Sequence, residues 1–232
     1  MSKEVYLIVG LGNPGAEYAN TRHNAGFEVM TLLEKHFGVT LGRKMLQGFM
    51  CEITEEERKI VLCEPQTFMN NSGDCVSALA RWYHAPLDHL MVIYDDIDLP
   101  PGRVRVRRNG GPGTHNGMRS IVASLGEQNF PRIRVGTGDR PAGEDLISWV
   151  LGRPRTPEEQ NLMDKAFALA AECALDWLEH GIEHAARICE EKQKPAREES
   201  GESADANTAA WRRNNTALNI LKNKQEHEES DK

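Results

Sequence analysis

Histidine, aspartate and asparagine side chains fall in loops of this sequence where they could catalyse hydrolysis. His23 lies in the polar stretch Thr21–Asn24, between a short apolar run and the first helical pattern. Asp95 ends a second apolar run, at a position where ligands gather in open α/β sheets. A neutral imidazole can take a proton from water, and a buried carboxylate can orient that imidazole. His23 and Asp95 are therefore a candidate base and its partner.

Three asparagines in turn-rich loops could complete such a site: Asn13, Asn70 and Asn116. An uncharged amide can both donate and accept hydrogen bonds to an ester or peptide group. Each asparagine, taken singly, is also a common turn former. The sequence contains neither a G-x-S-x-G segment nor a cysteine beside a histidine, so it offers no obvious covalent nucleophile. Direct attack by water is the favoured chemistry.

His115 and Asn116 follow the glycine-rich stretch Gly110–Gly113. Glycines let backbone amides approach a substrate closely, although a simple flexible connector would have the same composition. Both interpretations of this loop stay open.

Two motifs suggest other chemistry and are disfavoured by their surroundings. Gly10–Gly15 matches the dinucleotide fingerprint G-x-G-x-x-G, but the residues after it are polar and lack a helical period. A substrate loop is favoured there, with a plain tight turn as the alternative. His180–His184 matches the zinc-protease pattern H-x-x-E-H, but Gly181 interrupts the helix and the sequence suggests no third ligand. We expect solvated histidines there, with no metal.

Charge is distributed unevenly along the chain. The 28 basic and 35 acidic residues give a net charge of −7, which disfavours a polyanionic partner. Residues 101–155 nevertheless contain ten arginines and four acidic residues, a local excess of six positive charges (10 − 4). Arg105 and Arg134 fall in strand-like segments and could bind phosphate. A solvated or salt-bridged sheet edge is the alternative.

Alternating apolar runs and helical patterns predict a single α/β domain over residues 1–190. The remaining residues, 191–232, are predicted to form a charged, disordered extension, because its first part has almost no large apolar residue. The expected elements are strands at 5–10, 47–54, 58–63, 90–94, 104–107 and 132–138, and helices at 27–37, 72–83 (capped by Ser72), 115–125 and 157–189.

Five cysteines without a C-x-x-C pair indicate a reducing compartment such as the cytoplasm. The chain starts with neither a secretory leader nor an apolar run long enough to enter a membrane. We expect a cytoplasmic protein with no membrane association.

Ordered sequence blocks resemble the bacterial peptidyl-tRNA hydrolases. The first block spans residues 10–26 and contains Gly10-Leu-Gly-Asn-Pro-Gly and Thr21-Arg-His23-Asn24. The later blocks are Pro65–Gly73, Asp95–Gly102, Gly113–Gly117 and Val150–Pro154. The resemblance extends from about Val5 to Cys189. It implies one three-layer α/β/α domain with a mixed, mostly parallel, twisted sheet.

The same resemblance implies a hydrolase that cleaves the ester between a peptide and the 3′ end of tRNA, without metal or cofactor. His23 would activate water, Asp95 would orient His23, and Asn13 would help to recognise the peptidyl group. Substrate would contact Tyr18, Phe68, Met69, Asn70, His115 and Asn116, while Arg105 and Arg134 would bind tRNA phosphates. The expected state is a monomer with no obligate protein partner.

Thr114 stands where many relatives have glycine, and the extension after about residue 190 has no counterpart in the family. Neither difference removes a catalytic residue. A non-catalytic RNA-binding relative of the same fold is the alternative function.

Overall fold

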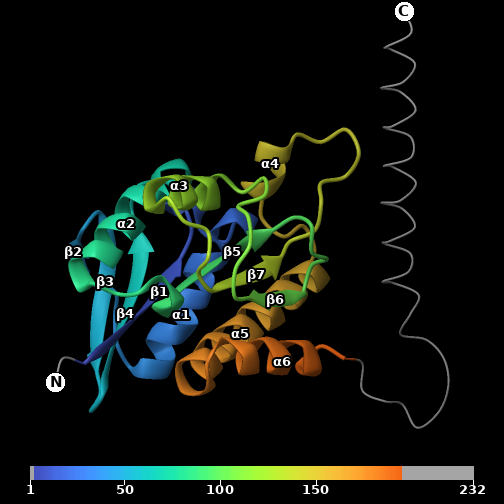
Figure 1. The fold of residues 1–232 in the computed structure, drawn as a ribbon. Helices are drawn as coiled ribbons and strands as arrows, with labels where there is room; N and C mark the ends of the chain where they lie inside the picture. Colours follow the sequence, from blue (N-terminus) through green and yellow to red (C-terminus); the bar gives the residue numbers. More distant parts are fainter. Residues whose placement is uncertain (1–2, 195–232) are drawn as a thin grey trace, which may run out of the picture. The chain divides into compact units, whose positions relative to one another are not determined.

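The computed structural model describes residues 3–194, which form a seven-stranded sheet covered by helices on both faces (Figure 1). Short 3-10 turns connect several elements: η1 (Ala16–Tyr18), η2 (Arg22–Asn24), η3 (Met69–Asn71) and η4 (Leu87–His89). The strands and helices are, in chain order, β1 (Glu4–Gly10), α1 (Ala25–Phe37), β2 (Arg43–Met45), β3 (Gly48–Thr54), β4 (Arg58–Pro65), α2 (Ser72–Tyr83), β5 (Leu90–Asp96), β6 (Val104–Arg107), α3 (Asn116–Leu125), β7 (Arg132–Gly136), α4 (Leu146–Val150), α5 (Pro157–His180) and α6 (Ile182–Lys192).

The sheet is mixed, as the sequence predicted. Its strand order is β2-β3-β4-β1-β5-β7-β6, with parallel pairing across the four central strands. The three outer pairings, β2 with β3, β3 with β4 and β6 with β7, are antiparallel. Parallel and antiparallel pairings are therefore equal in number, whereas a mostly parallel sheet was expected.

Alternation along the central strands divides the core into two layers. On β1, Ile8 packs with α1, α5 and α6 on one face of the sheet, while Leu7 and Val9 pack with α2 and α3 on the other (Figure 1). Successive side chains of a strand point to opposite faces, so an unbroken apolar run such as β1 needs helices on both sides. The expected three-layer α/β/α architecture follows from this pattern.

Two glycines bring α1 against the carboxyl ends of β1 and β5. A Cβ atom added to Gly26 would lie 2.2 Å from the backbone nitrogen of Leu11 and 2.6 Å from the carbonyl oxygen of Ile93. A Cβ atom on Gly10 would lie 2.4 Å from the carbonyl oxygen of Gly26. No larger residue fits at either glycine. The close contact places η2, which contains His23, beside the end of β5.

The structure corrects several expected boundaries. The helix expected at 157–189 is two helices, because Gly181 has φ of +81° and separates α5 from α6. Ser72 does not cap α2: it is the first helical residue, and its hydroxyl donates to the carbonyl of Met69 at 2.9 Å. Strand β2 and helix α4 were not predicted; both are short, with three and five residues.

The end of the folded part also lies further along the chain than expected. Helix α6 continues to Lys192, and the side chain of Gln193 hydrogen-bonds the backbone of Val104. The rest of the predicted extension, after residue 194, lies outside the described residues. Among the helices of residues 3–194, none is long and apolar enough to cross a membrane.

Candidate active site

His23 and His115 both contact the carboxylate of Asp95, which lies next to the carboxyl end of the fully buried strand β5. The Nδ1 atom of His23 lies 2.8 Å from Oδ1 of Asp95, and Nε2 of His115 lies 3.0 Å from the same oxygen. The exposed fraction of the side chain is 2% for Asp95, 12% for His23 and 9% for His115. These three side chains form a buried cluster, which we call the buried triad.

The partners of each ring nitrogen decide which atom carries a proton. Nδ1 of His115 accepts the backbone N–H of Met118 at 3.2 Å and caps α3, so its Nε2 must carry the proton that is donated to Asp95. A carboxylate accepts, so Nδ1 of His23 must also be protonated. In neutral His23 the lone pair is then on Nε2, which is the nitrogen that can act as a base.

Burial and charge act in opposite directions on the two central groups. Burial lowers the pKa of His23, but attraction to Asp95 and the hydrogen bond with it prevail, so that pKa is raised above its ordinary value. Burial would raise the pKa of Asp95, but His23 and His115 hold it well below its usual range. Asp95 therefore stays ionised and stabilises a proton on His23.

Asn13 is held by the backbone of the following loops. Its Oδ1 accepts the N–H of Met69 at 2.8 Å, and no group among the described residues accepts from its amide NH₂. Its own backbone N–H donates to Oδ1 of Asn24 at 2.9 Å, and Nδ2 of Asn24 donates back to its carbonyl at 3.0 Å. The buried Asn24 was not among the predicted site residues, although it adjoins His23 in the sequence.

The loop before α2 has a strained backbone and an exposed aromatic ring. Phe68 has φ of +58°, a region that non-glycine residues rarely adopt, and 52% of its surface is exposed. Its ring meets that of Tyr18 edge to face, with the centroids 6.2 Å apart. The adjacent Met69 is buried against Gly117, where an added Cβ atom would lie 2.5 Å from its sulfur. Asn70 follows and is exposed.

A cavity of about 200 Å³, open to solvent, lies on one side of the buried triad. Among the predicted site residues it is lined by His23, Asp95, His115, Asn116 and Arg134. Another predicted group lies outside its lining: Asn13, Tyr18, Phe68, Met69, Asn70 and Arg105. Apart from Arg105, which lies on β6 opposite Arg134, this second group meets the first where Asn24 and Gly117 contact Asn13 and Met69.

Four arginines occupy one face of the antiparallel pair β6 and β7. Arg105 is opposite Arg134, and Arg107 is opposite Arg132. Arg107 and Arg132 both line the cavity, and Arg132 was not proposed as a site residue from the sequence. The alternation on β6 showed that Arg107 shares a face with Arg105, but the pairing with β7 required the register.

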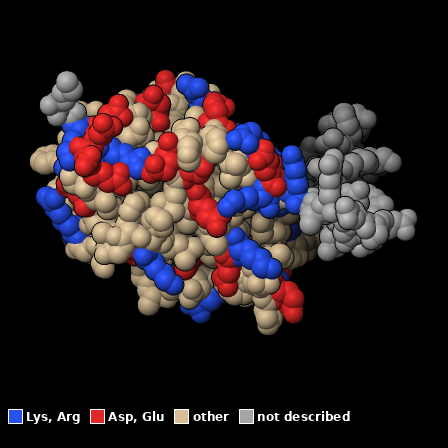
Figure 2. Space-filling model, turned by 90° about the horizontal axis from the view of Figure 1, so that it is seen from below, with Lys and Arg blue, Asp and Glu red and all other residues tan. Residues whose placement is uncertain are grey.

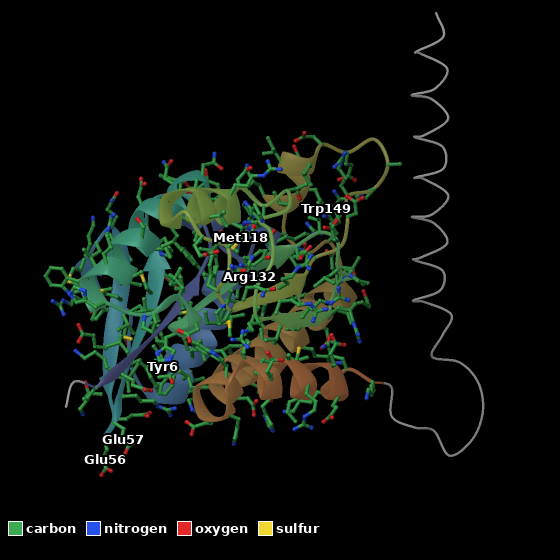
Figure 3. All side chains as sticks on the ribbon, viewed as in Figure 1. Tyr6, Glu56, Glu57, Met118, Arg132 and Trp149 are labelled. Atoms are coloured by element: carbon green, nitrogen blue, oxygen red, sulfur yellow. The ribbon has the colours of Figure 1, made fainter. Side chains whose placement is uncertain are left out.

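These arginines differ in what they contact. The Nε–H of Arg134 donates to the Asp96 carboxylate, which raises the pKa of Arg134 against the opposing effect of burial. Arg132 is buried and donates to the carbonyls of Gly110 and Gly111, so it holds the glycine-rich loop in place. Figure 3 shows Arg132 in the middle of the molecule.

Arg22 connects the loop of His23 to α4. It is 1% exposed, its guanidinium lies 3.7 Å from the ring centroid of Trp149, and it forms an ion pair with Glu159.

Helix α4 presents Ile147, which is 65% exposed, to the cavity. The acidic tip Glu56–Glu57 of the β3–β4 hairpin lies at the opposite end of the molecule from Trp149 (Figure 3).

Comparison with known proteins confirms the family indicated by the sequence. A family model described as peptidyl-tRNA hydrolase matches residues 7–197. The peptidyl-tRNA hydrolase of Caldanaerobacter subterraneus subsp. tengcongensis is 45% identical over 181 residues, covering 78% of this chain and 97% of that protein. That of Chloroflexus aurantiacus is 51% identical over 162 residues, covering 69% and 86%.

A solved structure agrees with these sequence matches. The crystal structure of peptidyl-tRNA hydrolase from Acinetobacter baumannii is similar at a TM-score of 0.75 and 35% identity. The alignment covers 82% of this chain and 97% of that one. This chain belongs to the peptidyl-tRNA hydrolase family.

Proposed function

We propose that this chain hydrolyses the ester bond between a peptide and the 3′ end of tRNA, and so releases tRNA from peptidyl-tRNA. One observation carries the proposal: the buried triad leaves Nε2 of His23 as its basic atom, and His23 lines a cavity that is open to solvent. The two relatives described above are named peptidyl-tRNA hydrolases, which agrees with this reaction.

The reaction begins when Nε2 of His23 takes a proton from water and the resulting hydroxide attacks the ester carbonyl. Asp95 stabilises the imidazolium that forms, because it stays ionised and accepts the Nδ1 proton. The tetrahedral intermediate then expels the ribose oxygen, which takes the proton back from His23. The products are a peptide with a free carboxyl group and an intact tRNA, and no metal or cofactor takes part in these steps.

Amide donors adjacent to His23 would hold the ester and the peptide. The NH₂ group of Asn13 is free to donate because Met69 engages its oxygen, and this group would distinguish a peptidyl carbonyl from a free amino group. Asn116, in the first turn of α3, would donate to the carbonyl oxygen as it becomes negative. Asn70, with the exposed ring of Phe68 and the half-buried ring of Tyr18, would line the path of the peptide or terminal adenosine.

The tRNA phosphates would bind Arg105 and Arg134, with Arg107 beside them. The terminal nitrogens of Arg134 have no hydrogen-bond partner among the described residues, since Asp96 takes only its Nε–H. On the face of α5 and α6, acidic and basic side chains are intermixed (Figure 2). We therefore expect the acceptor stem on the side of β6, α4 and the glycine-rich loop, where it would release counterions on binding.

We further propose that the chain acts in the cytoplasm, as a monomer without an obligate protein partner. All five cysteines are free thiols in the structure, which suits a reducing compartment. Size-exclusion chromatography with light scattering tests the monomeric state.

The decisive experiment compares N-acetyl-aminoacyl-tRNA with unblocked aminoacyl-tRNA as substrates for wild type and His23→Ala. We expect rapid release from the blocked substrate alone, and loss of release in His23→Ala with tRNA affinity unchanged. Binding of tRNA without release by wild type would overturn the proposal and favour a non-catalytic RNA-binding protein. Equal release by His23→Ala would remove His23 from the mechanism.

A further inference from the structure

A second cluster of two histidines and one aspartate lies where α5 meets α6, outside the site described above. Asp176 and His180 are one turn apart at the end of α5, and His184 lies in the first turn of α6. Nδ1 of His180 is 3.1 Å from Oδ1 of Asp176, and Nδ1 of His184 is 2.7 Å from Oδ2. We call this cluster the helix-junction triad.

The break at Gly181 keeps the two histidines together. Gly181 adopts φ of +81°, and an added Cβ atom would meet nothing within 4 Å, so glycine is required for the backbone conformation and not for space. The ring centroids of His180 and His184 remain 4.6 Å apart across this break. The sequence disfavoured a metal here because a third ligand was lacking, and Asp176 supplies that ligand.

Two imidazole nitrogens and a carboxylate oxygen are a donor set that suits Zn²⁺ and neighbouring divalent transition metals. One donor atom from each of the three side chains lies within 4.8 Å of the others. Bonds of 2.0–2.1 Å in a tetrahedral site separate the ligand atoms by about 3.4 Å. The rings therefore need only small rotations away from Asp176 to admit an ion, with water as the fourth ligand.

Exposure favours binding at this junction. The exposed fraction of the side chain is 17% for Asp176, 57% for His180 and 34% for His184, so an ion can enter from solvent without a large desolvation cost. Neutral imidazoles can move their proton from Nδ1 to Nε2, since none of the described residues hydrogen-bonds either Nε2 atom. In the buried triad, by contrast, Nδ1 of His115 is already engaged by a backbone N–H.

An ion at this junction would join α5 to a helix that covers the edge of the sheet. At the other end of α6, Gln193 accepts the N–H of Val104 at 2.7 Å and donates to its carbonyl at 2.8 Å, in the manner of an additional strand. Strand β6 would otherwise present an unpaired edge. A metal ion bound to both α5 and α6 would make the dissociation of α6 from the edge strand β6 less favourable.

We propose that Asp176, His180 and His184 bind a divalent transition-metal ion of the Zn²⁺ class, which fastens α6 to α5 and takes no part in hydrolysis. Binding converts two N–H···O hydrogen bonds into coordination bonds and involves no redox step. The ion stabilises the folded chain by an amount that rises with the logarithm of its concentration once that concentration exceeds the dissociation constant.

Isothermal titration of the full chain with ZnCl₂, after treatment with chelator, tests this site directly. We expect wild type to bind a single Zn²⁺ ion with a matching rise in Tm, and His180→Ala and His184→Ala to bind it more than about ten-fold more weakly. His36→Ala removes an exposed histidine from α1 and serves as the matched control, with wild-type affinity expected.

Three outcomes would overturn the proposal: no Zn²⁺ binding by wild type, equal affinity in His180→Ala and His184→Ala, or loss of binding in His23→Ala, which would place the ion in the buried triad. Hydrolysis of N-acetyl-aminoacyl-tRNA by His180→Ala, His184→Ala and His36→Ala reports whether these variants are folded, and tRNA binding reports the same for His23→Ala. Asp176→Asn, which keeps the shape of the side chain, provides a second test of the same ligand set.

Discussion

The buried triad and the helix-junction triad contain the same side chains, an aspartate between two histidines, in different surroundings. In the first, both histidines donate to one oxygen of an aspartate that is 2% exposed. In the second, each histidine meets a different oxygen of an aspartate that is 17% exposed. The two clusters show how surroundings assign chemistry to identical residue types.

Burial is the first difference, because electrostatic interactions are stronger where water is excluded. In the buried triad, the attraction between the histidines and Asp95 outweighs the effect of burial, so that the pKa of His23 is raised and the pKa of Asp95 is lowered. The second difference is the backbone N–H of Met118, which fixes the tautomer of His115 and has no counterpart at the helix junction among the described residues. A buried carboxylate with fixed tautomers suits proton transfer, while exposed rings that can change tautomer suit a metal ion.

Alanine at one histidine of each triad gives the largest expected contrast. His23→Ala should lower kcat by about 10²–10⁴-fold, because the general base is lost. His180→Ala should leave kcat unchanged, since this ring lies outside the cavity. Single-turnover hydrolysis of N-acetyl-aminoacyl-tRNA measures both. A large loss in His180→Ala would contradict the separation of the two clusters.

Asparagine at each aspartate tests the role of charge. Asp95→Asn should lower kcat/KM by about 10²-fold or more, because the imidazolium loses its counter-charge. The pKa of His23 is raised by Asp95, so without that charge burial lowers it. His23 acts when neutral, and the acid limb of the pH profile should therefore move to lower pH.

The same change at the helix junction, Asp176→Asn, should move neither the pH profile nor the rate. Measurement of kcat/KM against pH for both variants decides the point. An acid limb that stays in place in Asp95→Asn would show that another group controls the protonation of the base.

His115→Ala should shift the pH profile in the opposite direction. Asp95 keeps its charge but loses one donor, so it attracts the proton of His23 more strongly and raises the pKa of His23 further. The rate should fall by about 10- to 150-fold, since a hydrogen bond to a charged group contributes about 1.5–3 kcal/mol.

Stability should also fall by about 1 kcal/mol in His115→Ala, as for other lost helix caps. His184→Ala, the matched change at the helix junction, should leave the acid limb in place. A shift to lower pH in His115→Ala would mean that His115 does not act through Asp95.

Chelation is expected to have the smallest effect on hydrolysis. EDTA should leave the rate unchanged, because His23 activates water without a metal, but it should lower the Tm if Zn²⁺ occupies the helix junction. Parallel assays of turnover and thermal unfolding, with and without EDTA, compare the two clusters in one sample. Loss of turnover in EDTA would remove the distinction drawn between them.

Most elements could be predicted from the sequence because their signals are local. The apolar run of β1 and the helical spacing in α1 each arise from neighbouring residues. His23 and Asp95 could be paired in advance for a similar reason, since each lies in a loop or strand end that the pattern identifies. Short elements such as α4 were missed because five residues carry too little periodic signal.

Other features required the tertiary structure. The spacing of Asp176, His180 and His184 is visible in the sequence, yet Gly181 suggested a break that would separate them, and only its backbone conformation shows that they stay together. His115 was expected to bind substrate; its ring also caps α3 and holds Asp95, a contact between residues 20 positions apart.

The sequence by itself determined the order of the longer strands and helices, the family, and the residue types available for hydrolysis, because periodicity and motifs are local properties of the chain. Only the tertiary structure decided which nitrogen of each histidine is free, which way Asn13 presents its amide, and which arginines face each other across β6 and β7. These features depend on partners brought close by sheet register and helix packing, and neither is encoded in any single segment.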